Sequence, residues 1–552
     1  MKIGLYLPYW PAYRFSQNRE GLGRYWAALA KSLQLRKNRI VIACPPWSEK
    51  NIRSLLEEHR VRLDDIDFII PMRLPAIWKI WEFITSFRLK EKKPKITIQA
   101  IHDFINIAIR MLVRVKNTLV FLLLILIAFV VLLCTLPISM VASALVLLVT
   151  SIARFVISFP EKYMTNNAAV PHFHLFYKPI TKFIQLFFKT IYTTNTIEII
   201  RLEMAKYLRE DIASMCEPVD VWYCPMAFWP DFNEIEGVKV LCFPDVVTSV
   251  LPISFSTYGL TEMTDHVHNT VKGSKFFITY SEYQKNAILV NYLGKMPDNI
   301  IAIDLFANDT LVEIEPAFDM PFHTKSSLTK HYSRSIFPTL ISHTHPAAQQ
   351  YLGNSLKSFN FRSMQYIFFA SQFRPSKNIL NLVRAYRYLL IKKEVSFKLI
   401  LTGEFSSSNE LFEYIQHNHL QNDVLSFYRV SNQQLSALYM CAELVVNPTL
   451  FEGGFPMTFC EGMSVGTPSI LSRIPQVTDM LSGYHLDDCV FDPFDYVDIA
   501  NKIVFGIKNR DELIKRQRPL YDTLSKHSKD TAGAQYEMAF KHFIDMSKNG
   551  AN

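Results

Sequence analysis

The stretch best equipped for chemistry spans residues 451 to 471 and reads FEGGFPMTFCEGMSVGTPSIL. Glu452 and Glu461 flank a Gly-Gly-Phe-Pro turn, whose glycines let another molecule approach the main chain. Pro456 suits the first turn of a helix, and open amides at a helix start bind phosphate. The two carboxylates can accept hydrogen bonds from sugar hydroxyls. These features are compatible with a site for a phosphate-bearing sugar. Taken alone, however, the stretch fits an ordinary αβ connection with two solvated glutamates better, because short glycine motifs are common by chance.

Two cations stand in an earlier loop, QFRPSKN, which contains Arg374 and Lys377. They are three residues apart on a short turn, so both can hold one diphosphate, Arg by two parallel hydrogen bonds and Lys as a point charge. The alternative is a pair of exposed charges beside a helix start. A third loop begins at Gly403, after another apolar run. Because all three loops follow predicted strands, we expect them at one edge of a parallel sheet, where ligands bind in this fold class.

Alternating apolar runs and helical patterns form two βαβ series that must position these loops. In the first series, strands are predicted at 2–7, 39–43, 219–224, 238–243, 275–281 and 299–304, with a helix at 23–35. In the second, strands are predicted at 366–371, 397–403, 424–429, 444–448 and 469–472, with helices at 378–392, 408–417, 432–440 and 456–465. The order predicts an α/β fold of doubly wound sheets. Gly21 and Gly23 stand in a loop before the first helix and could meet an anion or a sugar.

Residues 117 to 153 contain no charge over 37 positions. A straight helix of that length would measure roughly 55 Å, against a hydrocarbon core of roughly 30 Å. Pro137 is the natural bend, which predicts a membrane hairpin at 117–159 with both ends in the cytoplasm, because basic residues flank it. A buried pair of helices is the alternative. Residues 174–192 mix lysines with bulky apolar side chains, which suits a helix in the headgroup region or, alternatively, a core helix.

Composition sets further bounds on the function. A net charge of +9 is spread over 59 basic and 50 acidic residues, without a zinc-finger spacing or a basic helix, which favours a lipid surface over nucleic acid. The start MKIGLYLPYWP is no signal peptide, because its apolar run is short and broken by Pro8. No CxxC pair occurs, so the cysteines are interpreted as reduced core residues of a cytosolic protein; they are Cys44, Cys134, Cys216, Cys224, Cys242, Cys441, Cys460 and Cys489.

The second series resembles the family 4 retaining glycosyltransferases of GT-B fold, which have two Rossmann-like domains facing a cleft. The likeness rests on the RPSKN loop, KLILTG, VVNP, EGGFP with its second glutamate, and GTP, and more loosely on GLGRY, FPDVVTSVLP and ITYSEYQK in the first series. It implies that Arg374 and Lys377 neutralise a donor diphosphate and that Glu461 binds a ribose. Glu452 would hold the sugar together with the amides of the donor segment, which comprises Gly454, Phe455, Pro456 and Met457. Gly403 would also contact the donor.

Two departures from the family pattern affect these roles. Eight residues separate the glutamates where the family usually has seven, so the loop carries one extra residue. Where many relatives have His-Asp, this chain has Pro244-Asp245, which leaves Asp245 as the candidate acceptor contact beside Glu452 as the other catalytic candidate. Gly21 and Gly23 would form an acceptor or phosphate loop.

The resemblance also implies how the chain is divided. Residues 1–310 would form the acceptor domain, interrupted by the hairpin and by amphipathic helices to about residue 215. Residues 311–360 are irregular, with scattered Pro, Ser and His, and are predicted to be a linker. Residues 361–520 would bind the nucleotide sugar, and a helix within 521–552 would pack back on the first domain.

The expected activity is transfer of a hexose, for example mannose, from GDP-mannose or a UDP-sugar to a lipid-linked acceptor or glycan. The site of action would be the cytoplasmic face of the inner membrane, in the biosynthesis of polysaccharide, lipopolysaccharide or glycolipid. No metal or other cofactor is expected, because fixed cations supply the positive charge. Two rival readings are a nonenzymatic membrane-anchored scaffold of the same fold and a sugar-nucleotide epimerase.

Overall fold

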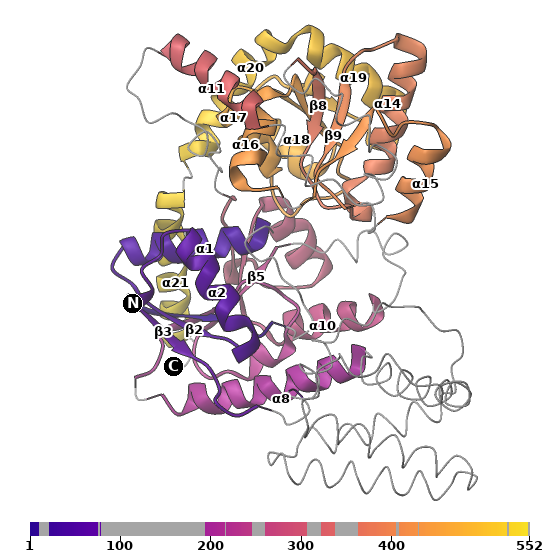
Figure 1. Ribbon diagram of the computed structural model, residues 1–552. Helices are drawn as coiled ribbons and strands as arrows, with labels where there is room; N and C mark the ends of the chain where they lie inside the picture. Colours follow the sequence, from indigo (N-terminus) through magenta and orange to yellow (C-terminus); the bar gives the residue numbers. More distant parts are fainter. Residues whose placement is uncertain are drawn as a thin grey trace, which may run out of the picture.

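A computed structural model describes residues 1–9, 21–74, 78, 194–215, 217–244, 260–305, 322–336, 363–404, 408–428, 430–526 and 529–549. These residues form two α/β domains, one above the other in Figure 1, each built around a parallel sheet.

The first sheet has seven strands in the order β3-β2-β1-β4-β5-β6-β7, all parallel. The strands are β1 (Lys2–Tyr6), β2 (Arg39–Ala43), β3 (Ile66–Ile69), β4 (Val221–Cys224), β5 (Lys239–Phe243), β6 (Phe276–Thr279) and β7 (Ile300–Ala302). Every residue of β4 and β6 is buried, as expected for strands covered on both faces. Gly4 is required in β1, because a Cβ there would lie 2.3 Å from Cε3 of Trp222.

The second sheet repeats this topology with six strands in the order β10-β9-β8-β11-β12-β13. Its strands are β8 (Tyr366–Phe369), β9 (Lys398–Leu401), β10 (Val424–Ser426), β11 (Leu444–Asn447), β12 (Ser469–Ser472) and β13 (Val490–Phe491). In both sheets the strand order reverses between two central neighbours, β1 and β4 in one and β8 and β11 in the other. Doubly wound folds bind ligands beside such a reversal, at the carboxyl ends of the strands.

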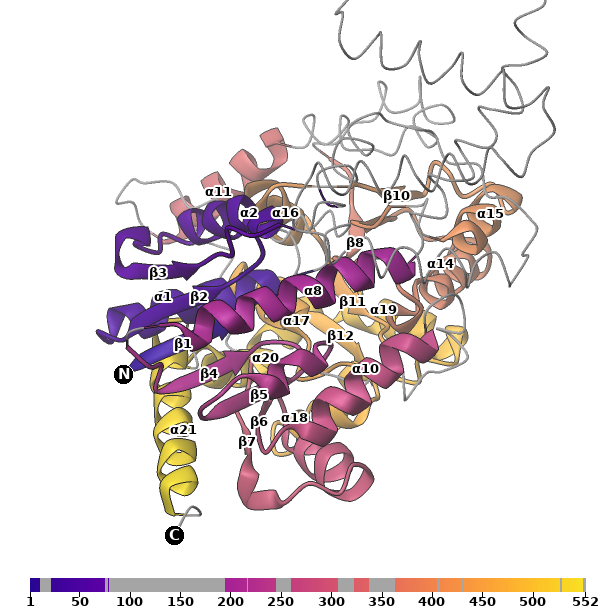
Figure 2. The same cartoon turned by 90° about the horizontal axis from the view of Figure 1, so that it is seen from below.

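Helices cover the sheets of both domains. In the first domain they are α1 (Gly21–Leu35), α2 (Pro46–Glu58), α8 (Thr194–Ala213) and α10 (Leu260–Gly273), of which α8 and α10 cross the domain in Figure 2. In the second they are α11 (Phe322–Ile336), α14 (Ile379–Lys393), α15 (Asn409–His417), α16 (Asn432–Cys441), α17 (Met457–Ser464), α18 (Pro475–Leu481), α19 (Tyr496–Lys508) and α20 (Arg510–Lys526).

The last helix, α21 (Lys529–Asn549), returns to the first domain and lies beside α1 (Figure 1). The two helices approach closely at Gly533, whose N–H donates to Ser32 Oγ at 2.9 Å. A Cβ at Gly533 would lie 2.8 Å from the Ser32 carbonyl carbon, so only glycine permits this approach. Arg36 of α1 also pairs with Glu537 of α21, with Nε 2.6 Å from Oε2.

The predicted linker at 311–360 needs a correction, because α11 lies within it. This helix packs on α16, and Arg334 donates from Nη1 to the carbonyl oxygen of Met364 at 2.6 Å. Thr329 and Ser333, one helical turn apart, are buried. Polar residues of modest helix propensity resemble a loop in sequence, but tertiary packing overrides that local preference.

Two further predictions concern the glycines near the first helix and the apolar hairpin. Helix α1 begins at Gly21, so Gly21 and Gly23 lie in its first turn and not in a preceding loop. The predicted hairpin at 117–159 lies outside the described residues. Within the described part of the chain, no helix has both the length and the apolar character that crossing a bilayer requires.

Candidate functional site

An ion pair bridges the strand reversal of the second sheet. Lys377 stands in the loop after β8 and Glu452 in the loop after β11, the two strands between which the order reverses. Lys377 Nζ lies 2.6 Å from Glu452 Oε1, and the side chains are 24% and 20% exposed. The structure therefore brings together two of the predicted site residues that are 75 positions apart in sequence.

The turn that carries the cations is held by the main chain. Residues Pro375–Lys377 form a short 3₁₀ helix, in which the Lys377 N–H donates to the Arg374 carbonyl at 2.9 Å. The Leu450 N–H donates to the carbonyl of Ser376 at 2.8 Å, which ties this turn to the loop of Glu452. Both loops are thus fixed to one another before any ligand arrives.

Arg374 lies at the start of the same turn and is exposed. Its Nε donates to Gln372 Oε1 at 2.9 Å. The turn therefore carries an exposed guanidinium and a half-buried ammonium, which is paired with Glu452, at the carboxyl edge of the sheet. Their contact with a diphosphate stays a prediction.

The glycine turn leads into α17, which begins at Met457 after Pro456, as expected. Phe455 and Pro456 are buried, and the Phe455 ring lies edge-on to Phe459 with centroids 5.2 Å apart. Asn447, the last residue of β11, donates from Nδ2 to Thr458 Oγ1 at 2.9 Å. The Phe459 N–H donates to the carbonyl of Pro456 at 3.1 Å, whereas helix geometry leaves the amides of Met457 and Thr458 without an intrahelical acceptor.

Glu461 lies in α17 but is only 3% exposed. Its Oε2 accepts a hydrogen bond of 2.6 Å from the hydroxyl of Tyr439 on α16. Tyr439 could not be predicted from the sequence, because a helical pattern does not say which residue of a neighbouring helix a side chain will contact. Burial, and then the nearby Glu461 carboxylate, raise the pKa of the adjacent Cys460 thiol to about 12, so this cysteine stays protonated at neutral pH.

Gly403 lies at the carboxyl end of β9, where its lack of a side chain has a packing reason. A Cβ there would fall 2.0 Å from Cδ1 of Phe373, whose ring occupies that space. Ser426 Oγ donates to the Gly403 carbonyl at 2.5 Å. Phe373 follows β8 and is buried, and the sequence interpretation did not single it out.

The candidate residues of the first domain are described only in part. Gly21 and Gly23 lie in the first turn of α1, which follows β1 along the chain. Asp245, the candidate acceptor contact, lies outside the described residues.

The second domain is similar to known proteins. Residues 357–520 match the family described as glycosyl transferases group 1. The lipopolysaccharide 1,2-N-acetylglucosaminetransferase of Salmonella typhimurium is 25% identical over 192 residues, which cover 32% of this chain and 49% of that protein. The chain thus spans about half the length of this curated relative. Assignment to family 4 stays a prediction.

Two solved structures have a similar overall fold. An E. coli structure described as trehalose-6-phosphate bound with UDP-2-fluoro glucose has a TM-score of 0.51 at 9% identity, covering 98% of this chain and 99% of that one. Anabaena HepE in complex with UDP-glucose has a TM-score of 0.51 at 12% identity, with the same coverage of 98% and 99%. Identities this low concern the fold alone, and together with the two parallel sheets they confirm the predicted α/β GT-B architecture.

Proposed function

We propose that the protein is a retaining glycosyltransferase that moves a hexosyl group from a nucleotide sugar to a lipid-linked acceptor. The observation that carries this proposal is the Lys377–Glu452 pair at the strand reversal, with Arg374 on the same turn and the start of α17 beside it. Cations there suit a diphosphate, and a carboxylate suits a sugar hydroxyl. The group 1 domain and the resemblance to the Salmonella enzyme support the same class of reaction.

The ion pair suggests how the donor is taken up. A donor diphosphate competes with Glu452 for Lys377, and the released carboxylate then accepts a hydrogen bond from a hydroxyl of the sugar. During transfer the bond from the anomeric carbon to the diphosphate oxygen breaks, and its electron pair stays with the diphosphate. The acceptor oxygen forms the new bond and gives up its proton, which the departing diphosphate oxygen accepts. Lys377 and Arg374 stabilise the charge that grows on the leaving group. No cofactor enters this proposal.

The acceptor and the cellular location are inferred from the apolar segment 117–153. We propose that it anchors the first domain at the cytoplasmic face of the inner membrane, where lipid-linked acceptors reach a high effective concentration. Envelope polysaccharide, lipopolysaccharide or glycolipid biosynthesis is the corresponding process. The name of the Salmonella relative supports a lipopolysaccharide substrate.

The test uses membranes that contain the full chain and labelled GDP-mannose, UDP-glucose or UDP-N-acetylglucosamine, with and without lipid extract. Transfer of label to lipid supports the proposal, and the anomeric configuration of the product reports retention. Binding without turnover would favour a scaffold, and release of an epimerised nucleotide sugar would favour an epimerase.

A matched pair of variants ties the activity to the site. Lys377→Ala should lower transfer by at least about tenfold, equivalent to a barrier higher by roughly 1.4 kcal/mol. Lys392→Ala is the control, because Lys392 is an exposed lysine in the last turn of α14 within the same domain. Equal turnover in the two variants would count against the assignment.

A further inference from the structure

The loop that carries Glu452 contacts both domains. Phe451 is 5% exposed and packs into the hydrophobic core of the first domain. The carbonyl of Gly453 accepts a hydrogen bond of 3.1 Å from Ser281 Oγ, which follows β6 of the first sheet. Between these two residues, Glu452 turns to Lys377 of its own domain. The position of the carboxylate is therefore fixed from two sides.

Gly454 brings the two main chains into direct contact. A Cβ at this position would lie 2.9 Å from the carbonyl oxygen of Tyr280 and 3.1 Å from its Cβ. Main-chain atoms cannot swing aside as the end of a flexible side chain can, so any other residue at 454 would push the domains apart. The second glycine of the turn is thus required by the contact between domains.

Tyr280 and Ser281 are themselves held firmly in the first domain. Ser281 Oγ accepts from the Gln284 N–H at 3.2 Å, which leaves its own proton to point at Gly453. The Tyr280 hydroxyl accepts from Cys242 Sγ at 3.2 Å, and its ring lies edge-on to Tyr25 with centroids 5.2 Å apart. The contact surface is therefore preorganised by the core of the first domain.

We infer that Ser281, together with the main chain of Tyr280, positions Glu452 for the donor sugar. This inference rests on the proposed function of the Glu452 loop. Ser281 is a positioning residue, since it acts through the Gly453 carbonyl. The consequence is that the donor site is complete only when the two domains meet, so the first domain shapes donor binding as well as acceptor binding.

Substitutions at Ser281 separate this role from simple helix capping. Thr keeps both hydrogen bonds. Asp keeps the acceptor for the Gln284 N–H but has no proton for the Gly453 carbonyl at neutral pH. In the full chain, Ser281→Asp should lower kcat/KM for the nucleotide sugar about tenfold, as expected for the loss of one hydrogen bond that holds the loop. Ser281→Thr should retain the activity of the unaltered protein.

A second measurement needs no turnover. Hydrogen–deuterium exchange of residues 451–457 should be faster in Ser281→Asp than in Ser281→Thr, while exchange in β4 and β5 stays equal. Gly454→Ala should accelerate exchange in the same segment. If the unaltered protein transfers no sugar but exchange responds as described, the proposed function fails and the positioning contact stands. If Ser281→Asp matches Ser281→Thr in both exchange and activity, the inference is overturned.

Discussion

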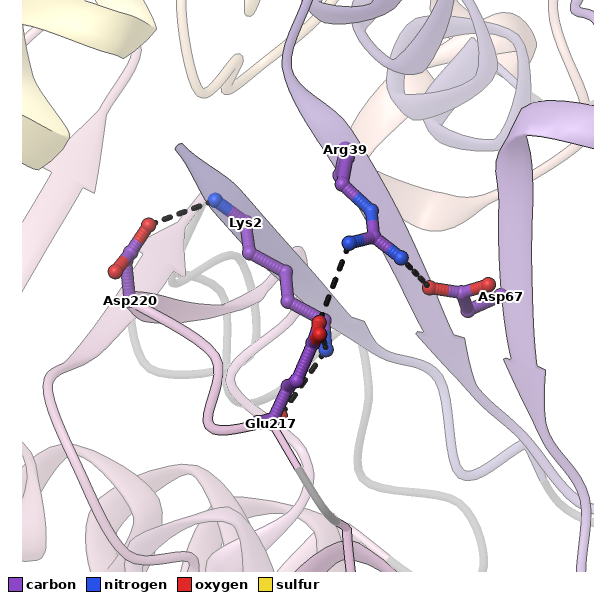
Figure 3. Close-up of polar contacts among 5 residues, drawn as sticks. All are labelled: Lys2, Arg39, Asp67, Glu217 and Asp220. Atoms are coloured by element: carbon purple, nitrogen blue, oxygen red, sulfur yellow. Dashed lines mark hydrogen bonds and ion pairs between the residues drawn. The ribbon is translucent and has the colours of Figure 1, made fainter.

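The two ends of strand β1 carry ionic groups of the same types in opposite settings. At the amino end, Lys2 and Arg39 both contact Glu217, and Arg39 also reaches Asp67, as Figure 3 shows. The side chains of Arg39 and Glu217 are 62% and 65% exposed. An open groove of about 740 Å³ lies beside them, lined mostly by charged residues. Water screens such pairs, which typically contribute little to stability.

At the carboxyl end of β1, the charges are removed from water. Tyr6 donates to one oxygen of Asp231, and Arg201 of α8 donates to the other at 2.6 Å. The side chains of Arg201 and Asp231 are 0% and 3% exposed. Burial, and then the Asp231 carboxylate, raise the pKa of the Tyr6 phenol well above its usual value, so Tyr6 stays a donor.

The comparison shows that solvent exposure, more than residue type, determines how much an ionic contact stabilises this fold. The exposed pairs link the amino ends of three strands but contribute little to stability. The buried trio of Tyr6, Asp231 and Arg201 fixes α8 against the sheet. The Lys377–Glu452 pair is intermediate, half-buried and at a ligand-binding edge. Its partial burial keeps both side chains in place, and its remaining exposure allows a ligand to replace one partner of the pair.

The buried trio gives the largest expected effect on stability. Arg201→Met removes the cation and leaves Asp231 buried, which should lower the free energy of unfolding by about 3–5 kcal/mol. All seven tryptophans precede residue 230, so the fluorescence of the full chain during urea unfolding reports on the first domain. Tyr6→Phe removes one hydrogen bond to Asp231 and should lower the free energy of unfolding by less than Arg201→Met does. A loss below about 1 kcal/mol for Arg201→Met would contradict the comparison.

The pair between α21 and α1 should give a smaller effect that depends on pH. Hydrogen bonding from Lys541, and then from Arg36, lowers the pKa of Glu537 to about 2 against the opposing effect of partial burial. A carboxylate with a lowered pKa stabilises the fold above its unfolded pKa of about 4.3, and that contribution fades as pH falls toward the folded value.

Glu537→Gln should therefore destabilise the first domain at pH 7 by about 1 kcal/mol, a figure discounted for solvent screening. The difference from the unaltered protein should shrink steadily between pH 5 and pH 3 in urea unfolding followed by tryptophan fluorescence. Glu49→Gln is the control, because Glu49 lies in the same domain and makes an ion pair with Arg53 of its own helix, at 2.8 Å. A difference that is constant with pH would contradict the assigned role of Glu537.

Much of the site followed from strand order. The loops of Arg374 and Glu452 each come after an apolar run, and parallel strands bring such loops to one edge. That argument places Lys377 near Glu452 without coordinates. The same argument does not predict which side chains of different elements will meet. Examples are the contacts of Tyr439 with Glu461 and of Ser281 with Gly453.

Other elements escaped prediction for identifiable reasons. β13 has two residues and β3 has four, too few for a clear apolar pattern. Helix α11 was missed because Thr329 and Ser333 resemble loop residues, although their small side chains are buried in the packed structure. Arg201 gave no signal either, since a lone arginine in a helical pattern normally indicates an exposed face.

The smallest expected effect belongs to the amino end of β1. Arg39→Met makes the same chemical change as Arg201→Met, but it breaks only exposed pairs, with Nη1 3.2 Å from Glu217 Oε2 and Nη2 3.3 Å from Asp67 Oδ2. The free energy of unfolding should change by less than about 0.5 kcal/mol, and the change should vanish in high salt because screening removes what attraction exists. Urea unfolding at low and high salt, followed by the same tryptophan signal, measures both quantities. A loss of stability comparable to that of Arg201→Met would show that solvent exposure does not explain the difference between the two ends of the strand. A loss that is independent of salt would show that Arg39 acts through packing of its aliphatic stem.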